Sequence, residues 1–432
     1  GTVAGLTYAL EHYGTMSLRE VIKPAVQLAG NGFEVSWDLS ENLKSRREFL
    51  SKNPATKKTF FKPDGSPYEA GDTLKQPELA KTLKLISRKG AAAFYQGEIA
   101  EKIVAEMEKG GGLITRQDLA DYKVAIRKPI VGAFRGYKVV SMPPTSSGGV
   151  HVVQMLNILS HFPLASYGAG SANATHLLAE TMKLAYADRS KHLGDQDFYD
   201  VPSEGLTSKS YAKALASTIS MKQARPSTEI LPGEPQRYES PDTTHFSVMD
   251  QFGNAVSNTY TLNFSYGSGI VIPGTGFLMN NEMDDFSAKQ GSANAFGLLG
   301  GEANAIEAGK RPLSSMTPTM VFKDNIPFVV TGSPGGSRII TTVLQVLVNV
   351  LEHDMNIAEA THFPRVHHQW LPDTLLLEPG LSPDTLVELE NRGQIIKNSS
   401  TQGSLQSIMF KGGLFYGSAD PRRPDAGVAG LR

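Results

Sequence analysis

The residues that could do chemistry gather past the middle of the chain, where hydroxyl side chains follow a proline-rich stretch. Thr243 lies in the run Pro241-Asp242-Thr243-Thr244-His245. A threonine without an adjacent base is a poor nucleophile, but a threonine at a new N-terminus has its own base in the free α-amine. Because that amine has a pKa of about 7.7–8.0, it can accept the proton at neutral pH. This run therefore permits acyl transfer by Thr243, freed by cleavage after Asp242.

The turn Gly332-Ser333-Pro334-Gly335-Gly336-Ser337-Arg338 offers a second chemical element. Consecutive glycines allow two backbone N–H groups to face one point, and a following helix adds the partial positive charge of its N-terminus. Gly335 and Gly336 are therefore candidates for an oxyanion hole, with a plain strand-to-helix turn as the alternative. A phosphate-binding loop is disfavoured, because the pattern G-x-x-x-x-G-K-[ST] is absent.

Two pairs of polar residues could bind the charged ends of a substrate. Glu282 and Asp285 are three positions apart, and carboxylates at a fixed separation suit an ammonium group, because an unpaired charge is costly in a closed site. Ser314 and Ser315 can donate two hydroxyl hydrogen bonds. From the residues alone, a solvated acidic loop and an ordinary turn remain the alternatives.

Taken together, these motifs resemble the γ-glutamyltransferase family of N-terminal-nucleophile hydrolases. The resemblance covers essentially the whole chain and is most specific in its second half. One glycine-rich motif would be weak evidence, whereas several motifs in order at family-like spacing are specific. The motifs not yet quoted are Gly1-Thr2-Val3-Ala4-Gly5, Met142-Pro143-Pro144-Thr145-Ser146-Ser147-Gly148-Gly149, Pro312-Leu313-Ser314-Ser315-Met316 and Asp420-Pro421-Arg422.

The resemblance implies transfer or hydrolysis of a γ-glutamyl group. Thr243 would attack the γ-amide carbonyl of glutathione, glutamine or a related donor, and water, an amino acid or a dipeptide would resolve the γ-glutamyl ester. Thr261 matches the residue that hydrogen-bonds the nucleophile, with β-propensity as the alternative explanation. Gly335 and Gly336 match the oxyanion hole. No metal or organic cofactor is implied.

The same resemblance assigns both charged ends of the donor. Asn263, Glu282 and Asp285 would grip the α-ammonium group, and Ser314 with Ser315 would hold the α-carboxylate. Family members often have glutamine at the position of Glu282, so glutamate adds negative charge here. In the family, the arginine that pairs with the carboxylate comes from a segment upstream of this sequence, so no arginine here is assigned that role.

The fold implied by the resemblance is α+β, a four-layer αββα sandwich of the N-terminal-nucleophile hydrolase type. Cleavage would leave a large part, residues 1–242, and a small part, residues 243–432, joined as a heterodimer in one intertwined structural domain. A periplasmic or secreted location is implied. A cephalosporin-type acylase is the close alternative, disfavoured because a glutaryl group has no ammonium for Glu282 and Asp285 to bind. An uncleaved precursor or fragment without catalytic function is the other alternative.

Composition excludes several other classes. The chain has 432 residues, a formal net charge of −1 and no cysteine. Disulfides and a cysteine nucleophile are therefore excluded, and nothing electrostatic favours nucleic acid or an anionic membrane as partner. The histidines form no HExxH motif, so a zinc site is disfavoured. The longest apolar run, around Ile339 to Leu351, is interrupted by polar residues and is shorter than the roughly 20 residues of a membrane span.

Capping motifs and hydrophobic periodicity predict the elements that position these groups. The first half is helix-rich. Helices are predicted to begin at the capping boxes of Ser17 and Thr115 and at Pro77, and to cover 91–109 and 175–193, with a strand over 137–142. Hairpins are predicted over 245–261 and 317–331, followed by a helix from about 338 to 353.

Three further segments carry specific expectations. Residues 221–242 contain four prolines and are predicted to form an extended, exposed tether before Thr243. The segment from Ala288 to Lys310 resembles a mobile lid, with Phe296 where many bacterial relatives place a tyrosine over the substrate. His367 and His368 are adjacent and project in different directions, so we expect them to be structural.

Overall fold

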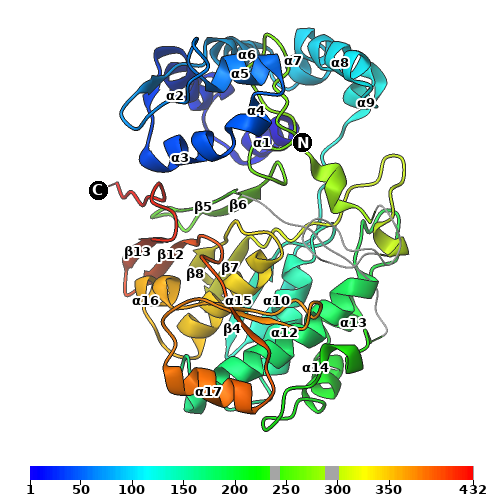
Figure 1. Ribbon diagram of the computed structural model, residues 1–432, viewed down its shortest axis with the longest axis vertical. Helices are drawn as coiled ribbons and strands as arrows, with labels where there is room; N and C mark the ends of the chain where they lie inside the picture. The colour runs from blue at the N-terminus through cyan, green and yellow to red at the C-terminus, as the bar shows by residue number, and fades with distance from the viewer. Residues whose placement is uncertain (234–243, 288–300, 432) are drawn as a thin grey trace. The chain divides into compact units, whose positions relative to one another are not determined.

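The computed structural model describes residues 1–233, 244–287 and 301–431, which fold into two compact units (Figure 1). The first unit combines Gly1–Arg127 with Ser265–Asn281, and the second combines Lys128–Phe264 with Glu282–Arg432. Each unit therefore contains residues from both sides of position 243. The expected division of the chain after residue 242 falls outside the described residues, so it stays a prediction.

The first unit is built mainly of helices. Its elements are α1 (Thr2–Tyr13), α2 (Leu18–Asn31), β1 (Phe33–Glu34), α3 (Trp37–Ser45), α4 (Arg47–Leu50), α5 (Pro54–Phe60), β2 (Thr73–Leu74), α6 (Pro77–Lys89), α7 (Ala92–Tyr95), α8 (Glu98–Gly110) and α9 (Arg116–Asp121). The capping boxes predicted at Ser17 and Thr115 are present at the starts of α2 and α9. Apolar clusters around Ile103 and around Leu43 give this unit cores of its own.

One predicted helix of this unit is wrong in extent. The single helix expected over 91–109 is two helices, α7 and α8, separated at Gln96 and Gly97. Gly97 has an extended backbone and is the N-cap of α8. Glycine inside a helix costs about 1 kcal/mol relative to alanine, so the chain breaks and restarts there. The apolar periodicity on both sides of Gly97 concealed this break.

The second unit contains a six-stranded sheet in which every neighbouring pair is antiparallel. Its order is β13-β12-β8-β7-β4-β3. The strands are β3 (Ile130–Phe134), β4 (Tyr137–Ser141), β7 (Thr319–Lys323), β8 (Ile326–Thr331), β12 (Gln406–Lys411) and β13 (Leu414–Ala419). The strand predicted over 137–142 and the hairpin predicted over 317–331 are thus confirmed. A small second sheet contains β9 (Val366–His367), β10 (Leu375–Leu377) and β11 (Ile396–Asn398).

Helices cover one face of the six-stranded sheet. The three that form its main apolar core are α10 (Gly148–Leu159), α12 (Ala172–His192) and α15 (Arg338–Leu351). The remaining α-helices of the second unit in the described chain are α11 (Leu164–Tyr167), α13 (Ser203–Leu206), α14 (Lys209–Ala216), α16 (Ile357–His362) and α17 (Pro383–Asn391). Leu156, Leu177 and Leu344, one from each main helix, meet Val139 and Val329 of the sheet in this core. In the described part of the chain, no helix combines the length and apolar character that crossing a bilayer requires.

The hairpin predicted over 245–261 is present as β5 (Thr244–Met249) and β6 (Ala255–Tyr260). It packs on β8 and β12. Figure 1 shows it on the side of the six-stranded sheet away from α10, α12 and α15. The Ser247 hydroxyl donates to the Gln406 carbonyl at 2.8 Å, and the Ser257 hydroxyl donates to the Thr331 carbonyl at 3.0 Å. Helices, sheet and hairpin are successive layers of the expected sandwich, and the α+β class is confirmed.

The described part of the proline-rich segment is not the exposed tether that its composition predicts. Ala224, Ser227 and Ile230 are buried, and Ser227 to Glu229 form the short 3₁₀ helix η1. The Ser227 amide and hydroxyl both donate to the Asp373 carboxylate at 2.8 Å. The three buried residues are three positions apart, and the residues between them are partly or fully exposed. Residues 234–242 lie outside the described chain, so the expectation for them stays untested.

Candidate active site

The nucleophile predicted from the sequence, Thr243, lies outside the described residues, but the hairpin that follows it is described. β5 begins at Thr244, which pairs with Tyr260 of β6. Thr261 comes directly after β6, and its hydroxyl accepts the Asn263 amide N–H at 2.8 Å. Asn263 is buried and has a φ of 72°, a left-handed conformation that asparagine tolerates better than most residues.

The histidine beside the predicted nucleophile is a packing residue of the hairpin. Hydrogen bonds join His245 Nδ1 to Thr259 Oγ1 at 2.8 Å and His245 Nε2 to Ser247 Oγ at 3.0 Å. Burial lowers the pKa of His245 to about 3, so the ring is neutral at neutral pH. A Cβ at Gly332 would come within 2.3 Å of this ring. Gly332 therefore gives His245 its space, a role that the sequence analysis missed.

The glycine turn before α15 presents two unused backbone donors. Gly335 and Gly336 have φ values of 135° and 68°, which favour glycine. Within residues 1–233, 244–287 and 301–431, the N–H groups of these two glycines donate no hydrogen bond. The helix α15 begins two residues later, at Arg338. Two available N–H groups next to a helix N-terminus can stabilise an oxyanion.

The structure brings the three residues predicted to bind an ammonium group together. Glu282 and Asp285, here called the acidic pair, are the ends of the 3₁₀ helix η2 (Glu282–Asp285). Burial raises the pKa of Glu282, against the opposing effects of hydrogen bonds with the Asp285 side chain and the Asn263 backbone. Asp285 is buried, and its carbonyl accepts Asn304 Nδ2 at 2.7 Å. Two carboxyl groups can share a hydrogen bond only when one of them holds a proton.

The two serines predicted to hold a carboxylate, here called the serine pair, lie on a loop joined to the segment 145–147. The Ser314 amide donates to the Thr145 carbonyl at 2.8 Å, and the Ser314 carbonyl accepts the Ser147 amide at 2.8 Å. The Ser314 hydroxyl accepts the Met316 amide at 3.1 Å. Ser315 is fully buried. The motifs around Ser147 and Ser314, far apart in sequence, therefore form one structural feature.

The sequence analysis missed a buried arginine beside this loop. Arg189, in the last turn of α12, is 1% exposed. Its Nε donates to Ser147 Oγ at 2.8 Å and its Nη2 donates to Ser315 Oγ at 2.7 Å. The sequence of α12 offers no clear signal for it, because the same helix contains Glu180, Lys183, Asp188 and Lys191, so that one more charged residue does not stand out.

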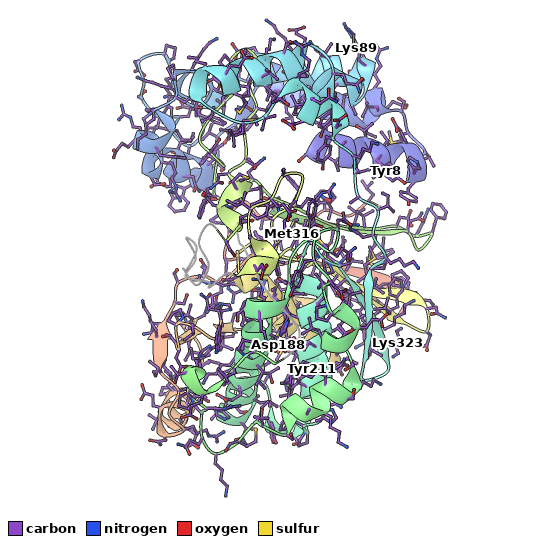
Figure 2. All side chains as sticks on the ribbon, turned by 90° about the vertical axis from the view of Figure 1, so that its right-hand side faces the viewer. Tyr8, Lys89, Asp188, Tyr211, Met316 and Lys323 are labelled. Carbon is purple, nitrogen blue, oxygen red and sulfur yellow. The ribbon has the colours of Figure 1, made fainter. Side chains whose placement is uncertain are left out.

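Next to Arg189, Asp188 anchors the chain just before residue 234. Its carboxylate accepts the Tyr211 hydroxyl at 2.9 Å, Gln154 Nε2 at 2.5 Å and the Gly233 amide at 2.9 Å. Figure 2 shows Asp188 and Tyr211 near each other in the second unit. Burial raises the pKa of Asp188 to about 6, although its hydrogen bonds oppose the shift. A second contact to Gly233, from His192 Nε2 to its carbonyl at 2.7 Å, fixes both sides of that residue.

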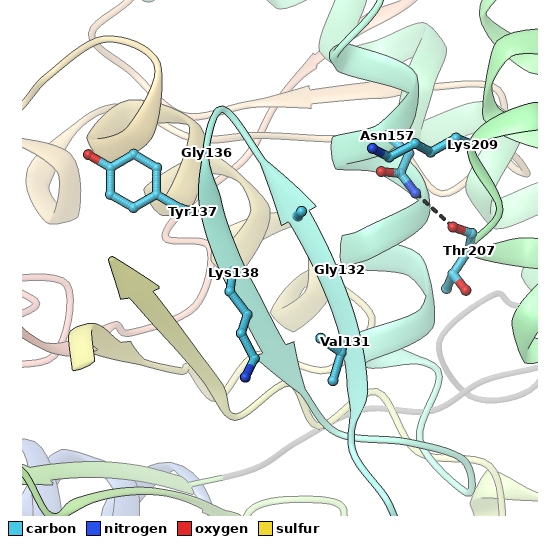
Figure 3. Close-up of a pocket in the computed structure, with 9 residues that line it drawn as sticks. Val131, Gly132, Gly136, Tyr137, Lys138, Asn157, Thr207 and Lys209 are labelled. Atoms are coloured by element: carbon cyan, nitrogen blue, oxygen red, sulfur yellow. Dashed lines mark hydrogen bonds between the residues drawn. The ribbon is translucent and has the colours of Figure 1, made fainter. Parts of the chain in front are cut away.

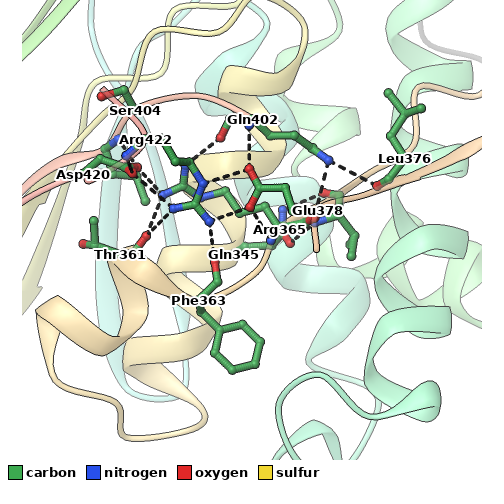
Figure 4. Close-up of polar contacts among 12 residues, drawn as sticks. Gln345, Thr361, Phe363, Arg365, Leu376, Glu378, Gln402, Ser404, Asp420 and Arg422 are labelled. Atoms are coloured by element: carbon green, nitrogen blue, oxygen red, sulfur yellow. Dashed lines mark hydrogen bonds and ion pairs between the residues drawn. The ribbon is translucent and has the colours of Figure 1, made fainter. Parts of the chain in front are cut away.

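The residues of the remaining family motif, Asp420-Pro421-Arg422, belong to a buried ion network (Figure 4). We call it the arginine network: Arg365, Glu378, Asp420 and Arg422. Arg365 pairs with Asp420 at 2.5 Å, and Arg422 pairs with Glu378 at 2.5 Å and with Asp420 at 3.1 Å. Two cations and two anions alternate, so the charges balance. The network ties the C-terminal motif to the loop after α16.

The other expectations are settled only in part. In the predicted lid, Ala303 and Asn304 are buried, and the Asn304 side chain is hydrogen-bonded to Asp285 and Leu313. Residues 306–309 are exposed, and Phe296 lies outside the described residues. His367 and His368 are buried; burial lowers the pKa of His367 to about 3.

A pocket of about 480 Å³ beside β3 contains none of the predicted site residues (Figure 3). Among the described residues, no cluster of three His, Asp or Glu could hold a metal ion.

Comparison with known proteins identifies the family. The family model described as Gamma-glutamyltranspeptidase matches residues 1–430. The chain belongs to this family. The resemblance stated from the sequence is therefore confirmed, as is its assignment as a γ-glutamyl-transferring enzyme.

Individual relatives agree with this assignment. The chain is 54% identical to the glutathione hydrolase proenzyme of Escherichia coli (strain K12), over 100% of this chain and 74% of the relative. It is 44% identical to the glutathione hydrolase proenzyme of Pseudomonas sp. (strain A14), over 98% of this chain and 75% of the relative. Among solved structures, the cephalosporin acylase from Bacillus halodurans has a TM-score of 0.89 at 27% identity, covering 99% of this chain and 77% of that one.

Proposed function

We propose that this chain transfers the γ-glutamyl group of glutathione or a related donor such as glutamine to water, an amino acid or a dipeptide. The observation that carries the proposal is the acidic pair, in which Asp285 is buried and Glu282 is half-buried and in contact with the Asn263 backbone. A donor with an α-ammonium group is the substrate that such a pair would select. Membership of the family and full-length similarity to glutathione hydrolase proenzymes support the same reaction.

Thr243 is the proposed nucleophile, freed by cleavage of the bond after Asp242. The described ladder ends with Thr244 opposite Tyr260, and the same register continued by one residue would oppose position 243 to Thr261. The Thr261 hydroxyl, which accepts the Asn263 amide, keeps its own proton to donate to the nucleophile. The α-amine of Thr243 would take the hydroxyl proton as the oxygen attacks the γ-carbonyl, and would pass that proton to the amide nitrogen as the C–N bond breaks and the amine leaves.

Charge that develops on the γ-carbonyl oxygen would be stabilised by Gly335 and Gly336. Their N–H groups are already oriented by the turn, so no reorganisation is needed when the oxyanion forms. The N-terminus of α15 adds to the favourable potential. In the second half-reaction, the same donors would stabilise the oxyanion formed when water or an amine attacks the γ-glutamyl ester.

The donor would be oriented by its two charged ends. An acidic pair that shares one proton has a net charge of −1, so one α-ammonium group neutralises it. The serine pair would donate to the α-carboxylate. A glutaryl group has a carboxylate but no ammonium group. The acidic pair therefore argues against the acylase alternative, even though an acylase structure shares the fold.

The two products of cleavage, residues 1–242 and 243–432, would stay together as a heterodimer. Each compact unit takes segments from both sides of the cut, so separation would expose the cores of both. A periplasmic or secreted location is part of the same proposal and rests on the family resemblance.

Mass spectrometry of the purified protein tests the proposal. We expect a fragment that begins at Thr243 and that gains the mass of one γ-glutamyl group when a glutathione reaction is quenched in acid. Thr243→Ala should remain a single chain and gain no mass. A new N-terminus at any other residue, or a γ-glutamyl adduct elsewhere, would contradict the proposed nucleophile.

A further inference from the structure

Arg189 joins two segments that are distant in sequence. Its guanidinium donates through Nε to Ser147 and through Nη2 to Ser315, at 2.8 and 2.7 Å. Both acceptors are buried, as is the arginine. Hydrogen bonds from a cationic donor are about twice as strong as those between neutral groups. The two bonds therefore fix both serine oxygens relative to the end of α12.

The two serines differ in what remains of their hydrogen-bonding capacity. A hydroxyl has one proton to donate and can accept two hydrogen bonds. Ser147 donates its proton to the Ser314 carbonyl at 2.9 Å, so its donor is used. Ser315 accepts from Arg189, and its proton is donated to no residue of the described chain.

The charge of Arg189 acts on nearby buried groups. Burial, with the nearby Arg189 charge acting in the same direction, lowers the pKa of His151 to about 3. A hydroxyl that accepts from a cation also becomes a better donor, because hydrogen bonds in a chain polarise one another. The Ser315 proton is thus both unused and activated.

We propose that Arg189 is a positioning residue for the donor α-carboxylate: it occupies one acceptor site of Ser315 and so turns the Ser315 hydroxyl proton toward the substrate. This inference rests on the proposed function, and it deepens that function by adding a residue that acts through Ser315 without touching the donor. The alternative is that Arg189 only braces the two loops.

Two substrates separate these roles. The γ-glutamyl and 4-aminobutanoyl p-nitroanilides share the amine and the scissile amide, and only the first has the α-carboxylate. In the full-length protein, Arg189→Lys should raise KM for the γ-glutamyl anilide about tenfold, the worth of roughly one hydrogen bond to a charged group, and leave kcat within about twofold. KM for the 4-aminobutanoyl anilide should stay the same.

A double mutant tests whether Arg189 acts through Ser315. Ser315→Ala alone should raise KM for the γ-glutamyl anilide by at least as much as Arg189→Lys, and adding Arg189→Lys should then change nothing further. Equal effects on both substrates, or additive effects in the double mutant, would show that Arg189 only braces the loops. If Arg189→Lys does not fold, Ser315→Ala alone still tests the proposal. If Ser315→Ala leaves the ratio of KM values for the two anilides unchanged, Ser315 does not bind the donor α-carboxylate, and Arg189 cannot act through it.

Lys183→Met is the matched control. Lys183 is a second buried cation of α12, paired with Glu180 at 2.9 Å and donating to the Arg225 carbonyl at 2.9 Å. Its loss should lower Tm without changing the ratio of KM values for the two anilides. Failure of the proposed function would be recognised separately: the parent protein would then not prefer the γ-glutamyl anilide at all, and the role of Arg189 would fail with it.

Discussion

The acidic pair and the arginine network are both clusters of largely buried charged groups in the second unit, yet the pKa of Glu282 and the pKa of Asp420 are shifted in opposite directions. In the network, the pKa of Asp420 is lowered: burial acts to raise it, but Arg365 and hydrogen bonds outweigh that effect. In the acidic pair, burial prevails and the pKa of Glu282 is raised. The network contains its own counter-charges, whereas the pair has two acids within hydrogen-bonding distance of each other.

This difference separates a cluster that stabilises the fold from one that is ready for a cationic ligand. A buried charge with a well-placed partner is costly to disrupt, because removing one member leaves the other uncompensated. Two neighbouring acids resist ionising together, and an incoming ammonium group relieves that conflict. Changes in the network should therefore affect stability, and changes in the pair should affect substrate recognition.

The largest effect is expected from breaking the network. Asp420→Asn removes a carboxylate that accepts from Arg365 at 2.5 Å and from the Leu405 amide at 2.8 Å. The loss should be about 3–5 kcal/mol of unfolding free energy, as for other broken buried pairs. Denaturant unfolding in the uncleaved Thr243→Ala background would measure it on a single chain.

The pH dependence of this loss has a definite sign. Because the folded pKa of Asp420 is lowered, its contribution is full above the unfolded pKa of about 3.9 and is lost as the pH falls through the folded value. The difference between parent and Asp420→Asn should therefore shrink below about pH 4. As a control, Lys411→Ala breaks an exposed pair with Asp354 and should cost less than about 1 kcal/mol. Equal losses for both variants would mean that the network is no stronger than a surface pair.

The second prediction concerns the acidic pair. Asp285→Ala should lower kcat/KM for a γ-glutamyl anilide at least about a hundredfold, because the donor ammonium would lose a desolvated partner. A glutaryl anilide, which lacks the ammonium group, should be affected far less. Thermal stability should change less than it does in Asp420→Asn.

Asp284→Ala is the matched control, since Asp284 is the exposed neighbour of Asp285 in η2. It should leave both anilide reactions nearly unchanged. Equal losses on the γ-glutamyl and glutaryl anilides in Asp285→Ala would count against ammonium recognition and would favour the acylase alternative.

The sequence could predict what depends on neighbouring residues. The capping box at Ser17 and the hairpin after Thr243 are local signals, and both are present. The spacing of Glu282 and Asp285 likewise predicts that they lie together. Arg189 could not be found this way, because its two partners are 42 and 126 residues away in sequence. The burial of Ser227 was missed for the same reason, since its partner Asp373 is 146 residues away.

The smallest effect is expected at Glu282, where the family often has glutamine. Because the folded pKa of Glu282 is raised by burial, its contribution to stability is full below the unfolded pKa of about 4.3 and is lost as the pH rises through the folded value. Glu282→Gln replaces a carboxyl group whose ionised form is penalised by burial with a neutral amide. The variant should be more stable than the parent at pH 7, with a Tm higher by about 2 °C, and this advantage should disappear below about pH 4.

Thermal unfolding of Glu282→Gln and its parent between pH 4 and pH 8, both in the Thr243→Ala background, would test this. The sign of the stability change distinguishes the two clusters. As the pH rises, Asp420→Asn should become less stable relative to its parent, whereas Glu282→Gln should become more stable relative to its parent. A Glu282→Gln chain that is less stable than its parent at pH 7 would show that the folded state favours the ionised carboxylate. The acidic pair would then have a compensating charge of its own, as the arginine network does, and would not need a substrate ammonium to balance it.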